Sequence, residues 1–198
     1  MQSQSHNPDV ILASSSVYRK LLLERLNLDF VVLSPDIDER PLEQEAPEHL
    51  VVRLAQEKAR AVSEQFPAAL VIGSDQLAVF ENNIIGKPGT DDAAVRQLHM
   101  FSGKCVQFLT AVRLCCTASG FDAGSMILTE VIFRELSDQE IQRYVKLDRP
   151  LDCAGGFKSE AAGISLLKSM RSQDPTAIVG LPLITVSALL REAGFEVP

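Results

Sequence analysis

Two ionisable side chains fall where apolar packing is expected, and both suit phosphate chemistry. Lys58 lies four residues from both Leu54 and Val62 in a segment of helical period, near the middle of its apolar face. An unpaired buried ammonium is costly, so this lysine either extends its amine to solvent or meets an anion. Asp75 follows the apolar run 69–73, at what we predict to be the carboxyl end of a central strand. There it either holds a divalent cation or activates water, or only caps the turn after the strand.

Further charged and anion-binding groups accompany this pair. Lys87, in Gly86-Lys87-Pro88, is either aimed at a phosphate or part of a simple turn. The run 14–16, which begins with Ser14, precedes an expected helix whose free N–H groups favour phosphate. Arg19 lies on the first turn of that helix, where a cation is unfavourable unless an anion binds nearby. The loop 36–40 adds carboxylates, although loop acids are usually solvated. Together these groups provide oxygen ligands for a hard cation and several positively charged side chains that can bind phosphates.

The first half of the chain has the pattern of an α/β layer. Short apolar runs predict strands at 10–13, 30–33 and 69–74, and helical spacing predicts helices at 18–26 and 47–66. The segment 34–45 is polar and contains proline, which is typical of a loop. Alternation of strands and helices indicates that some of the strands pair in parallel.

The second half is richer in long strands. We expect a hairpin from 77–80 and 84–85, long antiparallel strands at 105–116 and 126–133, and helices at 90–100, 138–145 and 182–193. The predicted fold class is therefore α/β, a mixed β-sheet with flanking helices and two lobes around a deep substrate cleft. We expect a single domain over residues 1–198, with residues 1–9 as a disordered tail.

The composition excludes several classes of protein. The 198 residues carry a formal net charge of −7, which argues against a protein that binds nucleic-acid polymers. No apolar run approaches the roughly 18 to 20 residues of a membrane helix, and the polar first nine residues do not resemble a signal peptide. We therefore expect a cytoplasmic protein without a membrane partner. The cysteines, at positions 105, 115, 116 and 153, show no metal-binding spacing and indicate reduced, mostly buried thiols.

In order along the chain, the same segments resemble the Maf family of nucleoside triphosphate pyrophosphatases. The matching stretches are Ile11-Leu12-Ala13-Ser14-Ser15-Ser16 with Arg19, Asp38-Glu39, Leu54-Ala55-Gln56-Glu57-Lys58-Ala59, Gly73-Ser74-Asp75-Gln76, Gly86-Lys87-Pro88, Phe101-Ser102-Gly103-Lys104, Ala154-Gly155 and Val179-Gly180-Leu181-Pro182-Leu183. The resemblance covers nearly the whole chain and implies an elongated fold like that of inosine triphosphate pyrophosphatases. It also implies a reaction on a small-molecule nucleoside triphosphate that needs a divalent cation, Mg²⁺ or Mn²⁺, and releases pyrophosphate.

The resemblance implies a role for each charged candidate. Asp75 matches the general base and metal-linked carboxylate of the family, and Glu39 helps to hold the cation. Ser14 lies where the first loop of the family wraps the phosphates. The residues that would neutralise the phosphate chain are Arg19, Lys58 and Lys87. A substrate would then be the anion that Lys58 requires.

Gln76 and the stretch 153–160 resemble the branch of the family that hydrolyses 7-methyl-GTP, whereas position 18 departs from that branch. Gln76 stands where members acting on thymidine and uridine triphosphates usually have threonine. Glu160, in the stretch 153–160, can accept hydrogen bonds from the guanine N1–H and amino group. Tyr18 replaces a tryptophan, and its ring either attracts a cationic methylated purine or is a core contact of the first helix.

Two alternatives stay open from the sequence. The first is the same reaction on UTP or TTP. The second is a nucleotide-binding regulator without turnover, since the family has been associated with septum formation. Retention of Asp75, Glu39 and Lys58 together argues against a pure binder. Whether the chain forms a homodimer is also open.

Overall fold

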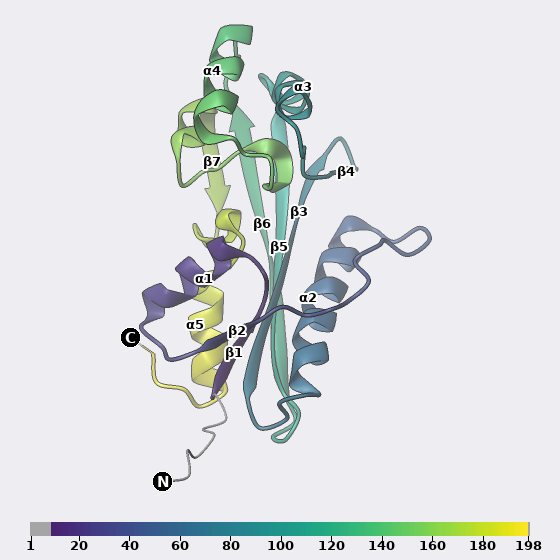
Figure 1. Cartoon of the computed structure of the whole chain (residues 1–198), viewed down its shortest axis with the longest axis vertical. Helices are drawn as coiled ribbons and strands as arrows, with labels where there is room; N and C mark the ends of the chain where they lie inside the picture. The colour runs from purple at the N-terminus through teal and green to yellow at the C-terminus, as the bar shows by residue number, and fades with distance from the viewer. Residues whose placement is uncertain (1–8, 198) are drawn as a thin grey trace.

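A computed structural model describes residues 9–197, which form one mixed sheet with helices on both faces (Figure 1). Of the expected N-terminal tail, all but Asp9 lies outside the described residues. The strands are β1 (Val10–Ala13), β2 (Val31–Leu33), β3 (Leu70–Phe80), β4 (Asn83–Ile85), β5 (Cys105–Cys116), β6 (Phe121–Phe133) and β7 (Leu167–Ser172). The main helices are α1 (Val17–Leu23), α2 (Pro47–Ser63), α3 (Asp91–Phe101), α4 (Asp138–Asp148) and α5 (Leu183–Glu192). Four short 3₁₀ segments complete the described structure: η1 (Glu24–Leu26), η2 (Ala154–Gly156), η3 (Ala162–Leu166) and η4 (Ala177–Val179).

The sheet has the strand order β2-β1-β3-β5-β6-β7. The short strand β4 pairs with the end of β3, on the same edge of β3 as β1. Strand β1 is parallel to both of its neighbours, and β5 and β6 pair antiparallel, which confirms the predictions of some parallel pairing and of an antiparallel pair of long strands. Strand β3 is also antiparallel to β5, so that β3, β5 and β6 form an antiparallel set. Figure 1 shows these three long strands running along the long axis of the molecule. They therefore connect the two ends of the protein and carry residues of both lobes.

The two lobes have separate cores on the same face of the sheet. In the upper lobe of Figure 1, α3 and α4 pack on Val106 and Phe108 of β5. In the lower lobe, α1 and α5 pack on Val112 and Leu114. Between these pairs β5 carries Thr110, which is fully buried and donates to the Ala177 carbonyl at 2.9 Å. Helix α2 covers the opposite face (Figure 1). A polar residue thus marks the boundary between the two apolar cores.

Most elements agree with the sequence-based prediction, with two corrections. The segments 69–74 and 77–80 form one strand, β3, because β5 pairs with it continuously from Val71 to Val79. Asp75 therefore lies inside a strand and not at its carboxyl end. Strand β7 was not predicted, because most of its residues are exposed at the sheet edge and lack an apolar alternation.

Two expectations from composition can be compared with the described residues. No helix among them is long and apolar enough to cross a membrane. All four cysteines are free, as predicted, but only Cys115 is buried. The expectation of mostly buried thiols was wrong, because Cys105 begins β5 at an exposed position and Cys153 lies in a loop.

Helix α4 begins with a capping box that makes part of the stability depend on pH. Hydrogen bonds from the Ser137 backbone and hydroxyl, and then one from Arg134, lower the pKa of Glu140 to about 2. A carboxyl group whose pKa is lowered on folding stabilises the folded state at pH values above its ordinary pKa, here 4.5. This contribution is lost as the pH falls toward 2. We expect the Tm deficit of Glu140→Gln to be largest near pH 7 and to shrink between pH 5 and pH 3. Thermal unfolding at several pH values, with Glu43→Gln in an exposed loop as control, measures this. A deficit that stays constant over that range would contradict the assignment.

Candidate functional site

A cleft of about 620 Å³ lies between the two lobes. Its walls come from the start of α1, the loop that carries Glu39, the inner face of α2, the middle of β3, the loop before α3 and the segments 152–160 and 178–180. Segments distant in sequence therefore meet at one place, as the predicted two-lobed fold requires.

The cleft reaches both faces of the sheet because one edge of β3 is open. Strand β1 pairs with β3 only as far as Gly73, and β4 begins to pair at Ala78. Between them, residues 74–77 pair only with β5 among the described strands. Asp75 points toward the α2 face and Gln76 toward the face between the lobes, since alternate strand residues point in opposite directions. This opening brings side chains from both faces into one site.

Lys58 and Asp75 form a buried ion pair at the bottom of the cleft. The Lys58 Nζ lies 2.6 Å from Asp75 Oδ1 and 2.6 Å from Glu39 Oε1, and the whole lysine is only 6% exposed. The alternative that its amine extends to solvent is therefore wrong. The hydrogen bond from Lys58 is the main cause that lowers the pKa of Glu39, and the charges of Lys87 and Arg19 add to it. Three cations thus converge on the two carboxylates.

The pair is close because Gly73 lets α2 approach β3. A Cβ atom at Gly73 would clash with the Ala55 carbonyl and lie 2.6 Å from the Ala59 backbone nitrogen. Both of these residues belong to α2 and flank Lys58 on the same buried side. A glycine two residues before Asp75 therefore sets the distance between the helix and the strand.

Arg19 is held at the cleft by backbone and hydroxyl groups. Its Nε donates to the Gly180 carbonyl at 2.9 Å, and its Nη1 donates to Ser14 Oγ at 3.4 Å. The same carbonyl accepts from the Ser74 hydroxyl at 3.0 Å. Ser14 is 2% exposed and supports Arg19 from behind, whereas Ser15 and Ser16 line the cleft. Burial lowers the pKa of Arg19, and the charges of Asp75 and Glu39 oppose that effect.

Lys87 is exposed and lines the same cleft. The side-chain amide of Gln97 on α3 donates to the Gly86 carbonyl at 2.9 Å, which attaches the lysine loop to the upper lobe. Sequence reasoning did not single out Gln97, and it quoted Ser74 and Gly180 only as members of stretches that match the family. The contacts of these three residues join segments distant in the chain, and no local pattern identifies such contacts.

The three residues expected to bind the base also line the cleft, with different freedom. The Gln76 amide nitrogen donates to Thr110 Oγ1 at 3.0 Å and to the carbonyls of Ala177 and Ile178 at 2.8 and 3.0 Å. It is therefore committed to the fold, and its oxygen is the atom that can face a ligand. Glu160 is exposed in the cleft. Tyr18 is half-buried and faces the cleft, so the alternative of a core contact is wrong.

The donor set fits a hard divalent cation shared with a ligand. Among residues 9–197 no cluster of three or more histidine, cysteine or acidic side chains could hold a metal by itself. Asp75 and Glu39 nevertheless meet at one cation, the Lys58 ammonium, and offer carboxylate oxygens. Such oxygens suit Mg²⁺ or Mn²⁺, which keep only one or two protein carboxylates when phosphates supply further ligands.

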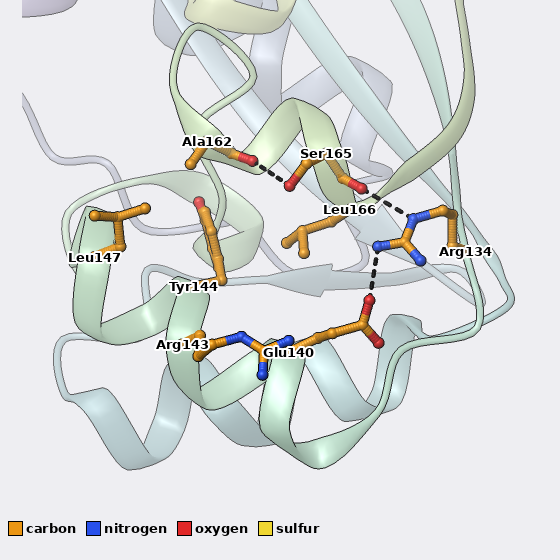
Figure 2. A pocket seen from close by; sticks show the side chains of 8 residues that line it. All are labelled: Arg134, Glu140, Arg143, Tyr144, Leu147, Ala162, Ser165 and Leu166. Atoms are coloured by element: carbon orange, nitrogen blue, oxygen red, sulfur yellow. Dashed lines mark hydrogen bonds and ion pairs between the residues drawn. The ribbon is translucent and has the colours of Figure 1, made fainter.

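A smaller pocket of about 310 Å³ lies between α4 and η3 (Figure 2). Figure 2 shows Arg134 directed toward Glu140, at 3.0 Å, and toward the Ser165 carbonyl, at 2.9 Å. These opposite charges compensate each other, and the Lys58–Asp75 pair lies in the other cleft. The chemistry described above therefore belongs to the larger cleft.

Comparisons with known proteins identify relatives of this chain. A family model described as Maf-like protein matches residues 9–193. A protein of Xanthomonas campestris pv. campestris named 7-methyl-GTP pyrophosphatase is 52% identical over 191 residues, which cover 96% of this chain and 99% of that protein. Proteins of the same name from Aromatoleum aromaticum and Pseudomonas aeruginosa are 53% and 50% identical, cover 96% of this chain and are themselves covered to 97% and 100%. The structure of the Staphylococcus aureus Ham1 protein matches with a TM-score of 0.52 at 12% identity over 93% of this chain and 98% of that one, which shows a shared fold.

Proposed function

This chain belongs to the Maf family, and we propose that it hydrolyses 7-methyl-GTP to 7-methyl-GMP and pyrophosphate. The observation that carries the proposal is the Lys58–Asp75 pair at the bottom of a cleft that also contains Arg19 and Lys87. The relatives of that name, about half identical over nearly the full chain, support the choice of substrate. The substrate is a small nucleotide, and the reaction requires no nucleic-acid polymer. The cytoplasmic location stays a prediction, and it is consistent with such a substrate.

In this proposal Asp75 acts as the general base. It accepts a proton from the water that attacks the anhydride, the P–O bond to the leaving group breaks, and pyrophosphate departs. Lys58, Arg19 and Lys87 neutralise the charge that develops on the phosphate oxygens. A divalent cation, when bound by Asp75 and Glu39, neutralises further phosphate charge. Ser14 contributes through Arg19, which its hydroxyl supports.

The base would lie toward the upper lobe, beside Tyr18, Gln76 and Glu160. The Glu160 carboxylate, which lines the cleft, would accept from the N1–H and amino group of guanine, a paired donor edge that uracil and thymine lack. The Gln76 oxygen adds an acceptor on the same side, because its nitrogen is already bonded to the protein.

A substrate panel tests the proposal. Pyrophosphate release from 7-methyl-GTP, GTP, UTP and TTP is measured with Mg²⁺ and with Mn²⁺. We expect kcat/KM for 7-methyl-GTP to exceed that for either pyrimidine nucleotide by at least about tenfold. A pyrimidine would leave the acceptors of the site without their hydrogen-bond donors, and such a loss lowers kcat/KM by this factor or more. A preference for UTP or TTP would refute the assignment of Gln76 and Glu160. Binding of these nucleotides without hydrolysis would instead favour a regulator.

A further inference from the structure

A cation already occupies an aromatic site at the base end of the cleft. The Lys158 Nζ lies 5.6 Å from the centroid of the Tyr18 ring and 4.0 Å from Asp152 Oδ1. The Tyr18 hydroxyl donates to Asp152 Oδ2 at 3.3 Å. The ring and the carboxylate therefore form one corner with two features that attract positive charge. We refer to Tyr18 and Asp152 as the cation corner.

The cation corner joins the two lobes across the cleft. Tyr18 belongs to α1 in the lower lobe, and Asp152 lies after α4 in the upper lobe. Both line the cleft, together with Glu160. The Lys158 amine at this corner also donates to the Asp148 carbonyl at 3.2 Å. A ligand in the cleft can contact the same ring and carboxylate, because both line the cleft.

The charge on Lys158 is maintained in this position. Burial lowers the pKa of Lys158, but the side-chain hydrogen bond with Tyr18 and then the charges of Cys153, Tyr18 and Asp152 outweigh burial, so this pKa is raised. The corner is therefore a site where a monovalent organic cation is stable next to an aromatic face.

We propose that Asp152 determines specificity by attracting the positive charge of a 7-methylated purine. In the absence of substrate, the Lys158 amine occupies the cation corner, and the base displaces it on binding. The inference rests on the proposed function and deepens it. Methylation at N7 gives the guanine ring a positive charge that unmodified guanine lacks. Both bases must displace the lysine amine, but only the charged ring regains its attraction to Tyr18 and Asp152. Selection by charge would then add to the hydrogen bonds that Glu160 offers to any guanine.

The exposure of Asp152 sets the size of the effect. Its side chain is 64% exposed, so water and salt screen its charge. We expect Asp152→Asn to lower the preference for 7-methyl-GMP over GMP, measured as a ratio of Kd values, by about three- to fivefold. The asparagine keeps an acceptor for the Tyr18 hydroxyl, so this change removes charge with little loss of shape. The preference of the wild type should also weaken with rising salt, and that of the variant should not.

Lys158→Met tests the place-holding role. Removal of the competing amine should lower the Kd for 7-methyl-GMP while the preference over GMP is retained or increased. Asp92→Asn, which removes the same charge from an exposed position on α3, is the matched control and should leave the preference unchanged. If the Asp152 and Lys158 variants shift the preference in the same direction, the inference is overturned.

Binding and turnover together separate the two proposals. If the wild type hydrolyses 7-methyl-GTP but Asp152→Asn keeps the full preference, the inference fails and the proposed function stands. If the wild type prefers 7-methyl-GMP in binding but releases no pyrophosphate, the proposed function fails and the cation corner stands. No preference in the wild type overturns the inference directly.

Discussion

Asp75→Asn is expected to lower kcat for pyrophosphate release about a thousandfold, within the range that a general base contributes. The asparagine cannot accept the proton of the attacking water, because its amide is not basic. The variant should still fold, since Lys58 keeps its 2.6 Å ion pair with Glu39 and the amide oxygen replaces one carboxylate oxygen. We therefore expect KM to change much less than kcat.

The measurement compares steady-state pyrophosphate release with thermal unfolding of the same preparations. Asp122→Asn is a suitable control, because Asp122 lies on the same sheet, pairs with Arg113 and does not line the cleft. It should keep its activity. An Asp75→Asn enzyme that retains more than about a tenth of the wild-type kcat would exclude Asp75 as the base.

Gly73→Ala is expected to destabilise the protein by about 3 kcal/mol, the upper end of the usual cost of overpacking. The new Cβ would meet the Ala55 carbonyl and the Ala59 nitrogen, which are backbone atoms of α2 and cannot rotate away. For a chain of this size the loss corresponds to a fall in Tm of about 6–12 °C. Activity should fall as well, because displacement of α2 moves Lys58 away from Asp75.

Gly86→Ala provides the matched control for stability. It adds the same methyl group to another glycine of the site, but a Cβ there meets nothing within 4 Å. Its unfolding free energy should remain within about 0.5 kcal/mol of the wild type. If Gly73→Ala were equally neutral, the close approach of α2 to β3 would not be what positions the ion pair.

Local patterns predicted most of the fold. Helical period and the long β-rich runs are both patterns of residues that are neighbours in sequence. The extent of β3 and the existence of β7 were not predictable in this way. A strand continues for as long as a partner pairs with it, and for both strands that partner is distant in the chain.

The sequence by itself determined which groups are present and which of them are out of place. Lys58 on an apolar helix face had to meet an anion or reach solvent, because residue type and helical period set the cost of its burial. The family resemblance assigned roles to Asp75 and its neighbours on the same local basis.

Only the tertiary structure decided which groups meet. The sheet opens beside Asp75 because β1 ends and β4 begins on either side of it, and Gly73 allows Lys58 to reach that point. The cation corner likewise depends on α1 meeting a loop more than a hundred residues later. Distances between such groups follow from nonlocal pairing and packing, which no run of adjacent residues encodes.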